Sequence, residues 1–347
     1  MRRQFLLIPG LIVILLFASL GYGQGQLKLY PFKANKEYGF IDSYGRIVIS
    51  PQFTKAKEFY EGLAAIEIKD VWGFMDTKGK IVINPQFSEV DAFHNGFAFV
   101  REKSTSGKYG YIDKNGKIVI QPQFTKATKF ESGLAAVKAS AGYGYIDRTG
   151  KMIIPAKFQD AGAFSNGLAL VKSGSLYGYI DKSGQFVIKP QFSKALSFSE
   201  SLAAVKVGNS WGYIDKSGQY IIKSQFNDAD EFSCGLAAVR IGNSTNGKYG
   251  YVNKNGQLVI STQFKAAEKF SEGLAAVKVG DKWGFINQMG QMVVNPLYKS
   301  VEDFHGGLAL VELSKDSKEN AQGSSQPDND LSGVIDPMGR YTYGPAE

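Results

Sequence analysis

The chain has 347 residues, of which 44% are hydrophobic and 13% aromatic, and its formal net charge is +8. This content of apolar and aromatic side chains excludes a disordered protein, because a disordered chain buries too little apolar surface to offset its conformational entropy. A single cysteine excludes an internal disulfide, and one cysteine with two histidines argues against a zinc site.

The first 23 residues have the features of an export signal. Arg2 and Arg3 precede an apolar run from Phe5 to Leu20, and glycines follow that run. A basic start, a short apolar stretch and small residues at its exit are typical of a secretory signal peptide. We expect cleavage after Gly23, which would place the protein in the periplasm, on the cell surface or outside the cell. The alternative is an uncleaved membrane anchor, although the apolar run is slightly shorter than the about 20 residues that a helix needs to span a bilayer.

Residues 24–347 are expected to form one domain that is built from a repeat. An aromatic residue followed by glycine recurs eight times, and consecutive copies lie 34 to 38 residues apart. A regular period of this length predicts a repeat architecture. Because the repeated residues are Tyr, Phe, Ile, Val and Gly, the unit should consist of strands and tight turns. The pairs are Tyr38–Gly39, Trp72–Gly73, Tyr109–Gly110, Tyr143–Gly144, Tyr177–Gly178, Trp211–Gly212, Tyr249–Gly250 and Trp283–Gly284.

Each copy is predicted to be a three-stranded antiparallel unit, as the copy that starts at Lys108 illustrates. Its strands are YGYID, KIVI and GLAAVK. Asp113-x-x-Gly116 between the first two predicts a hairpin turn, since Asp accepts the turn's N–H groups and Gly adopts the left-handed conformation. Before the third strand, Phe124, Ala127 and Phe130 are three residues apart, which fits either a turn of helix or an irregular loop.

All changes of length between copies fall in one part of the repeat. The distance from the aromatic–Gly glycine to the glycine of GLAA (Ser201 in one copy) is 23 residues in all eight copies. The hairpin tip after it varies, at 101–108, 241–248 and 312–331. Tips in water tolerate insertions, whereas links through a core do not. We therefore expect the longer tips on one side of the array and expect the longest, polar tip to be disordered.

The two ends depart from the repeat. Leu27–Lys33 resembles a third strand without its preceding link, and Gly333–Tyr343 is a hairpin without the aromatic residue. Terminal units of an open array are atypical because they cover its outer faces. We therefore expect an all-β, open and curved array of about eight three-stranded units. The alternative is a closed β-propeller, in which the two ends would be halves of one shared blade.

The repeated strings are similar to a known family. WGFMDTKGKIVINPQF from Trp72, WGYIDKSGQYIIKSQF from Trp211 and WGFINQMGQMVVNPLY from Trp283 are each followed by a Phe and GLAAVK-like residues. This pattern resembles the bacterial WG-containing repeats from Tyr38 to Val311, with Tyr for Trp in five copies. No Trp–Gly is followed by Arg, which distinguishes the chain from the nucleic-acid-associated WGR domain. The resemblance implies a β-rich repeat protein that is often exported or surface-associated, and it implies no established activity.

Acidic residues recur at one position of the repeat, and we assign them to turns. Two copies carry Asn253 and Asn287 there, and Asn serves a turn as Asp does but cannot replace a charged ligand or a general acid. A calcium loop needs several oxygen ligands close together, whereas each turn offers one carboxylate. The acids are Asp42, Asp76, Asp113, Asp147, Asp181 and Asp215.

Other residues of a catalytic type are expected to have structural roles. Gly208–Gly212 matches G-x-S-x-G, but Ser210 is predicted in a hairpin tip and not in the strand-to-helix turn of a nucleophile elbow. His94 and His305 lie six units apart, which separates them unless the array closes. Cys234 is expected to be a free, partly exposed thiol. We therefore assign no catalytic, cofactor-binding or metal-binding residue, and the binding residues stay unassigned.

A phenylalanine that recurs in every copy fits either a core ladder or a stacking surface for sugars or bases. We assign it to the core, because a ladder demands the same shape in each layer and one buried aromatic contributes about 4–6 kcal/mol at most. Lysines such as Lys117, Lys138 and Lys206 lie beside strand ends and tips, where they favour solubility and screen strand edges rather than bind nucleic acid. The phenylalanines are Phe59, Phe93, Phe130, Phe164, Phe198, Phe232, Phe270 and Phe304.

These observations predict an exported, non-enzymatic scaffold that binds a protein or a surface glycan, without a cofactor. One alternative is a carbohydrate hydrolase that uses two carboxylates, because Glu302 and Asp303 break the repeat pattern. Another is electrostatic attachment to anionic envelope polymers, which salt would weaken. Acids near equivalent positions show ordinary polar variation: Asp91, Asp160, Asp228 and Asp230.

Overall fold

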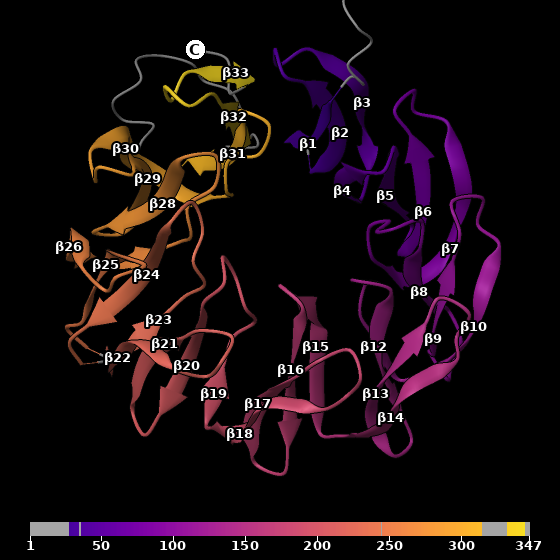
Figure 1. Ribbon diagram of the computed structural model, residues 1–347. Helices are drawn as coiled ribbons and strands as arrows, with labels where there is room; N and C mark the ends of the chain where they lie inside the picture. Colours follow the sequence, from indigo (N-terminus) through magenta and orange to yellow (C-terminus); the bar gives the residue numbers. More distant parts are fainter. Residues whose placement is uncertain (1–27, 35, 244, 314–331, 344–347) are drawn as a thin grey trace, which may run out of the picture.

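The computed structural model describes residues 28–34, 36–243, 245–313 and 332–343. Its sheets form a ring around a central opening, and the first and last strands meet where the ring closes (Figure 1). All elements of the described residues are strands, which confirms the prediction of an all-β repeat fold. Among them there is no helix of the length and apolarity needed to span a membrane. The predicted signal segment, 1–23, and most of the tip at 312–331 lie outside the described residues.

The strands of the described residues group into nine blades. Two long strands, β7 and β30, each serve as the last strand of one blade and the first strand of the next. The first three blades are blade 1, with β1 (Leu29–Ala34), β2 (Glu37–Asp42) and β3 (Ile47–Phe53); blade 2, with β4 (Lys55–Tyr60), β5 (Leu63–Ile68), β6 (Val71–Asp76) and the start of β7 (Ile81–Val90); and blade 3, with the end of β7, β8 (Ala98–Glu102), β9 (Tyr109–Ile112) and β10 (Ile118–Phe124).

The next three blades are separate four-stranded sheets. They are blade 4, with β11 (Lys126–Ala127), β12 (Leu134–Ala139), β13 (Gly142–Asp147) and β14 (Met152–Phe158); blade 5, with β15 (Asp160–Ser165), β16 (Leu168–Ser173), β17 (Leu176–Ile180) and β18 (Phe186–Phe192); and blade 6, with β19 (Lys194–Ala195), β20 (Ala203–Val207), β21 (Ser210–Ile214) and β22 (Tyr220–Phe226).

The last three blades complete the ring. They are blade 7, with β23 (Asp228–Ala229), β24 (Leu236–Ile241), β25 (Lys248–Asn253) and β26 (Leu258–Phe264); blade 8, with β27 (Ala266–Ala267), β28 (Leu274–Val279), β29 (Lys282–Asn287) and the start of β30 (Met292–Val301); and blade 9, with the end of β30, β31 (Ala309–Leu313), β32 (Ser332–Ile335) and β33 (Tyr341–Tyr343).

Blades 2 to 9 have four strands, which corrects the prediction of three-stranded units. The additional strand is the first of each blade, and in blade 4 it consists only of Lys126 and Ala127, which pair with Lys138 and Val137 of β12. From the sequence alone, this segment fits either a helical turn or a loop. Two paired residues are too few to show the alternating pattern by which a strand is recognised, so the pattern could not reveal it.

The aromatic–Gly pair needs its glycine because the fourth strand of the blade approaches closely. In blade 4, the pairing of β13 with β14 shifts register on both sides of Tyr145. A Cβ atom on Gly144 would lie 2.5 Å from the carbonyl oxygen of Ile154. A Cβ atom added to any of the eight aromatic–Gly glycines would lie 2.4–2.6 Å from the equivalent carbonyl oxygen. Glycine is therefore the residue that fits beside this bulge.

The repeated Asp-x-x-Gly sequences form hairpin turns, as predicted. One carboxylate oxygen of Asp113 accepts the backbone N–H groups of Asn115 and Lys117, both at 2.9 Å, and Gly116 has a φ of +80°. The side-chain oxygen of Asn253 accepts two backbone N–H groups in the same way, both at 3.0 Å. Asn thus replaces Asp in the turn without loss of these bonds, which confirms the structural role of the repeated acids.

The hydrophobic core is a series of clusters, each shared by two neighbouring blades. Phe130 of blade 4 packs against Tyr111 of blade 3, with ring centroids 4.8 Å apart. The Tyr111 hydroxyl also donates a hydrogen bond of 2.8 Å to the carbonyl oxygen of Thr128. Seven of the eight recurring phenylalanines are buried and Phe59 is half-buried, so their assignment to the core is confirmed.

The ring closes where blade 1 packs on blade 9, and the strand pairs of the described residues include none between these two blades. The rings of Phe32 and Tyr343 lie 4.5 Å apart, and Phe32 shares a buried cluster with Val334. Of the two arrangements that the sequence allowed, the structure therefore shows the closed ring rather than the open array. The two ends form separate blades, not halves of a shared one.

Each blade presents two different ends to solvent. The hairpin between β12 and β13 of blade 4, and its equivalent in the other blades, lies at one end of the ring, which we call the tip face. The Asp-x-x-Gly turns lie at the opposite end, the turn face. Because all blades run in the same strand order, the long tips at 103–108 in blade 3 and, as far as they are described, at 242–243 and 245–247 in blade 7 both belong to the tip face, as the sequence predicted.

Candidate binding face

The tip face carries a cation beside the aromatic residue of every repeat. In blade 4, Lys138 of β12 lies directly opposite Tyr143 of β13, and its Nζ atom is 5.4 Å from the ring centroid. A cation within about 6 Å of an aromatic centroid is attracted by the negative face of the ring. The pairs are Lys33–Tyr38, Lys55–Trp72, Lys57–Trp72, Arg101–Tyr109, Lys138–Tyr143, Lys172–Tyr177, Lys206–Trp211, Arg240–Tyr249 and Lys278–Trp283.

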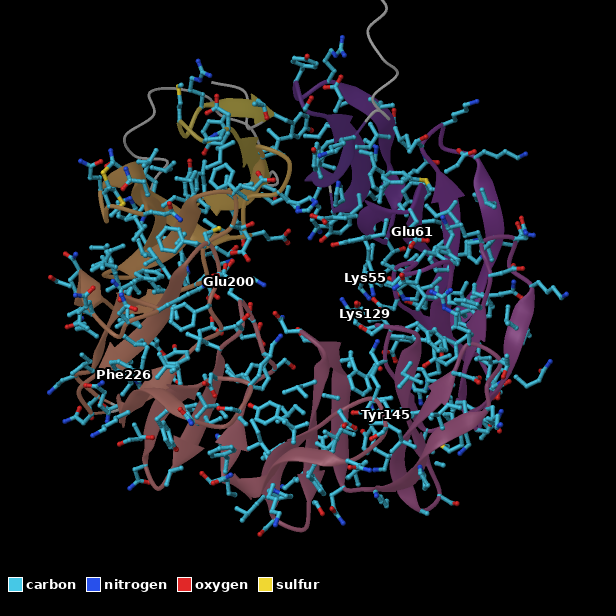
Figure 2. All side chains as sticks on the ribbon, viewed as in Figure 1. Lys55, Glu61, Lys129, Tyr145, Glu200 and Phe226 are labelled. Atoms are coloured by element: carbon cyan, nitrogen blue, oxygen red, sulfur yellow. The ribbon has the colours of Figure 1, made fainter. Side chains whose placement is uncertain are left out.

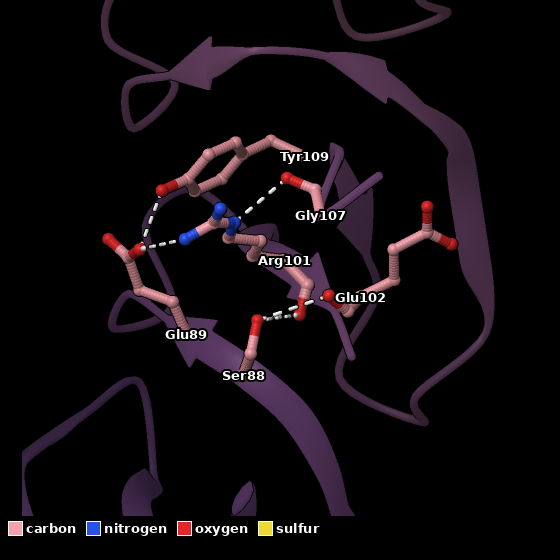
Figure 3. A network of polar contacts seen from close by, with 6 residues as sticks. All are labelled: Ser88, Glu89, Arg101, Glu102, Gly107 and Tyr109. Atoms are coloured by element: carbon pink, nitrogen blue, oxygen red, sulfur yellow. Dashed lines mark hydrogen bonds and ion pairs between the residues drawn. The ribbon is translucent and has the colours of Figure 1, made fainter. Parts of the chain in front are cut away.

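In blade 3 the cation belongs to a closed polar network (Figure 3). The Tyr109 hydroxyl donates a hydrogen bond of 2.5 Å to Glu89, and a guanidinium nitrogen of Arg101 lies 3.9 Å from the same carboxylate. The Arg101 Nε atom donates to the carbonyl oxygen of Gly107 at 2.8 Å, which anchors the long tip. Burial, and after it the bond to Glu89, raises the pKa of Tyr109 to about 12. The Arg101 charge is therefore neutralised within the blade.

Blade 7 repeats this arrangement with different residues. The Tyr249 hydroxyl donates to Asp228 at 2.7 Å, and Asp228 lies directly opposite Arg240 in the pairing of β23 with β24. Burial, and then the bond to Asp228, raises the pKa of Tyr249 to about 12. In blade 2 the charges are reversed, because Lys55 of β4 lies 3.1 Å from Glu67 of β5. In blades 2, 3, 5 and 7 the first strand thus supplies a residue that balances the charge opposite it, whereas blade 8 places Ala266 opposite Lys278.

Blades 4 and 6 break this rule. Lys126 of β11 lies opposite Lys138 of β12, and Lys194 of β19 lies opposite Lys206 of β20. Like charges directly opposite one another on neighbouring strands are destabilising. Within the residues that the structure describes, none of these four lysines forms an ion pair. Their charges are therefore available to an external anion.

A second group of charges lies farther along the segments that follow the first strands. Lys129, which follows β11, lies at the central opening in Figure 2, and the corresponding segments of blades 7 to 9 carry carboxyl groups. Burial is the largest cause that raises the pKa of Glu302 and Asp303, and for Glu302 the charge of Glu58 is the next. Burial also raises the pKa of Glu231 and Glu268. These segments of blades 7 to 9 thus gather four carboxyl groups beside Lys269 of blade 8, whose charge acts on Glu231, Glu268 and Asp303.

The remaining sequence candidates are not brought together. Ser210 starts β21 in a hairpin tip, as predicted. His94 lies near Tyr60, with ring centroids 5.2 Å apart, whereas the Nε2 atom of His305 lies 3.4 Å from the Glu58 carboxylate across the closing seam. Cys234 is a free, exposed thiol on the turn face, as predicted. Each of these groups lies in a different blade or face.

Sequence reasoning missed the pairing that defines the lysine-rich blades. The sequence shows lysines one repeat apart at Lys138, Lys172 and Lys206. The residue opposite each of them could not be identified, because it depends on the pairing of the short first strand. The signal that could have found them is the residue two after each PQF-like phenylalanine, such as Lys126 after Phe124. It alternates in charge over the first six copies and is uncharged in the last two, as Ala266 and Ser300.

Comparison with solved structures shows the fold. A crystal structure of a eukaryotic initiation factor has a TM-score of 0.63 at 12% identity and covers 91% of this chain and 95% of its own, and it is of the β-propeller type. Dihydro-heme d1 dehydrogenase NirN has a TM-score of 0.49 at 12% identity, over 91% of this chain and 72% of its own. Hsv2 of Kluyveromyces lactis has a TM-score of 0.41 at 10% identity, over 72% and 89%. No curated protein matches the chain in sequence.

A family model for the WG containing repeat matches the chain eight times, from residue 38 to residue 315. The matched segments are 38–71, 72–105, 109–139, 143–177, 177–211, 211–244, 249–283 and 283–315. They cover most of the nine-bladed ring and follow the spacing of the aromatic–Gly pairs. The chain therefore belongs to the family of proteins built from WG-containing repeats.

Proposed function

We propose that the chain is an exported, non-enzymatic scaffold whose tip face binds a macromolecular partner, either a protein or a surface glycan. The observation that supports this most is that cations recur beside the aromatic residues on one face of the ring. Among the described residues, the longer tips lie on the same face, at 103–108, 242–243 and 245–247. Variable loops on a rigid scaffold are a common location of binding residues. Export is supported by the N-terminal sequence pattern.

The two faces can be tested separately because the chain has one cysteine, and this cysteine is exposed on the turn face. A polyethylene glycol maleimide attached to Cys234 would block the turn face. In the variant Cys234→Ser with Asn209→Cys, the same reagent would block the tip of blade 6. Binding of each labelled protein to an envelope fraction of the source organism would then be measured.

The proposal expects the polymer at Asn209→Cys to abolish retention by the envelope fraction and the polymer at Cys234 to leave it unchanged. The unlabelled variant serves as the control for folding. Loss of retention only with the Cys234 label would place binding on the turn face and contradict the proposal. Equal retention of all labelled proteins would also contradict the proposal.

A second candidate function is hydrolysis of a carbohydrate by carboxyl groups near the central opening. The raised pKa of Glu302 and of Asp303 favours it, because a general acid must hold its proton near neutral pH. Release of reducing sugar from envelope glycans by the purified chain would be measured. Activity that disappears in Glu302→Gln, with an unchanged melting temperature, would establish this function in place of the scaffold.

A further inference from the structure

We propose that blades 4 to 6 form a binding site for an acidic polysaccharide, an inference that rests on the proposed function of the tip face. The site consists of six lysines, which we call the lysine sector. Four of them are exposed and Lys172 and Lys206 are half-buried. The lysine sector comprises Lys126, Lys138, Lys157, Lys172, Lys194 and Lys206.

The first argument is that blades 4 and 6 keep like-charged pairs at a position where blades 2, 3, 5 and 7 pair opposite charges. Glu89 faces Arg101 in blade 3 and Asp228 faces Arg240 in blade 7, so the fold accepts an acid at this place. Blades 4 and 6 instead oppose lysine to lysine. An unfavourable arrangement that recurs two blades apart is expected where binding of an anion compensates for it.

The local backbone holds these lysines in place. The hydroxyl groups of Thr125 and Ser193, which precede the first-strand lysines, donate hydrogen bonds of 3.2 and 3.1 Å to the carbonyl oxygens of Lys138 and Lys206. The charged groups of Lys138 and Lys206 lie 5.4 and 6.0 Å from the centroids of Tyr143 and Trp211. The cations are thus ordered on rigid strands before a ligand arrives, which lowers the entropic cost of binding.

The acids nearest in the repeat are already engaged. Asp160 lies opposite Lys172 within blade 5, and one of its carboxylate oxygens accepts the N–H group of Ala161 at 2.9 Å. Asp228 accepts the Tyr249 hydroxyl. Neither acid forms an ion pair with the lysines of blades 4 and 6 in the described part of the chain.

The hairpin tips leave the lysine sector accessible and mark its limits. The tips of blades 4, 5 and 6 are short and contain no charged residue, at 139–142, 173–176 and 207–210. The two blades on either side, 3 and 7, carry longer tips, described at 103–108 and at 242–243 with 245–247. Three neighbouring blades therefore present lysines without charged tips above them.

The arrangement of the charges favours a polymer over a single small anion. The two lysine pairs belong to blades separated by a whole blade, so one small anion does not engage both, whereas a chain with a carboxylate on each residue does. Carboxylates of a polyuronate are weak, repeated charges of this kind, and export would bring the protein to envelope glycans. Simultaneous contact with both pairs would add to affinity because the second contact is intramolecular.

The test uses full-length protein and an oligomer of alginate, a polyuronate, as the probe. The variant Lys126→Glu with Lys194→Glu restores the acid–base pairing that Glu89 and Arg101 show in blade 3. The control is Lys182→Glu with Lys216→Glu, which changes the net charge equally but lies in exposed turns of blades 5 and 6 on the turn face. Calorimetry would measure binding of alginate and of neutral dextran, and thermal melts would measure stability.

We expect the tip-face variant to bind alginate at least about tenfold more weakly while its melting temperature stays equal or rises, because two repulsive pairs become attractive. The turn-face control should keep alginate affinity within about threefold, since its charges lie away from the site. Neutral dextran should not bind. A stable fold with weakened binding excludes misfolding as the cause.

Equal loss of affinity in both variants would show attraction to net charge alone and overturn the site. Equal binding of duplex DNA or of phosphatidylglycerol vesicles through these lysines would overturn the choice of polysaccharide. If the variant loses no alginate affinity while a polymer on Asn209→Cys still blocks envelope binding, the lysine sector is wrong and the tip-face function stands. If the lysine substitutions leave alginate affinity unchanged and the polymer on Asn209→Cys leaves envelope binding unchanged, the proposed function of the tip face fails as well.

Discussion

The interface between blades 5 and 6 and the closing seam between blades 9 and 1 join similar sheets with different residues. In the first, Tyr179 packs against Phe198 with centroids 4.8 Å apart, and its hydroxyl donates to the carbonyl oxygen of Leu196 at 2.7 Å. At the seam, Phe32 packs against Tyr343. Among the described strands, no strand pair joins the two blades at either interface. Repetition supplies the first interface, and end-specific residues supply the second.

At the seam, the large side chains come from the side of the interface that carries small side chains between interior blades, and the small side chains come from the other side. Blade 1 lacks a first strand in the described residues, and with it the recurring core phenylalanine. Its β1 carries Tyr30 and Phe32 where β12 carries Ala135 and Val137, so aromatic volume enters from the second strand. Conversely, β32 carries Val334 where β9 carries tyrosine. The ends of a ring can therefore pack densely without sharing a strand.

The largest expected effect comes from removing the seam's central aromatic. Phe32 is fully buried, so Phe32→Ala should destabilise the protein by about 3–5 kcal/mol through lost burial and a cavity. Phe198→Ala, at the buried interior equivalent, should cost a similar amount. Denaturant melts followed by fluorescence would measure both losses.

Hydrogen exchange would separate the two variants. Phe32→Ala should accelerate amide exchange in β1 and β32 before other strands, because Phe32 packs in the buried cluster that these two strands share. Phe198→Ala should leave β1 and β32 protected relative to blades 5 and 6. An equal rise of exchange across the whole ring in Phe32→Ala would mean that the seam is not a separate weak point.

The next effect concerns a feature that every complete repeat shares. Gly144→Ala places a Cβ atom within 2.5 Å of the Ile154 carbonyl oxygen and 2.7 Å of the Ala156 nitrogen, both of them backbone atoms. Because a strand bulge must move to admit it, we expect a loss of about 1–3 kcal/mol in unfolding melts. Gly133→Ala provides the control for strain alone, because Gly133 has a φ of +87° and an open environment. A smaller loss at Gly144 than at Gly133 would refute the close-approach explanation.

The sequence predicted the features that recur in many copies of the repeat. The eight-fold spacing, the Asp113–Gly116 turn and the phenylalanine ladder each appear in enough copies for their physical cause to be inferred. It could not identify β11, because two residues make no pattern, nor decide closure, because Tyr30, Phe32 and Val334 occur once each. The lysine pairs were missed for the first reason, since they depend on the register of that short strand.

Alkaline pH should destabilise blades 3 and 7 more than blade 9 at the seam. Burial raises the pKa of Tyr109 and of Tyr249 to about 12, against 10.0 in the unfolded chain, while Ser332 stands at this position in blade 9. The folded state holds these protons more tightly, so their contribution to stability is complete below pH 10 and is lost as the pH rises toward 12. Urea midpoints measured between pH 9 and 11.5 should fall. The fall should be shallower in Tyr109→Phe with Tyr249→Phe, and an unchanged slope would contradict the assignment.

The smallest effect tests the hydroxyl that distinguishes an interior interface. Tyr179→Phe keeps the ring against Phe198 but removes the donor to the carbonyl oxygen of Leu196. A net hydrogen bond contributes about 1 kcal/mol, so the free energy of unfolding should fall by this amount. Blades 2 and 8 carry Phe74 and Phe285 at the same position, which shows that the fold accepts the change. Tyr220→Phe, at a ring that is 42% exposed, should cost nothing measurable. Equal losses in the two variants would mean that the inter-blade hydroxyl adds no stability, and that the interior interfaces, like the seam, are held by packing alone.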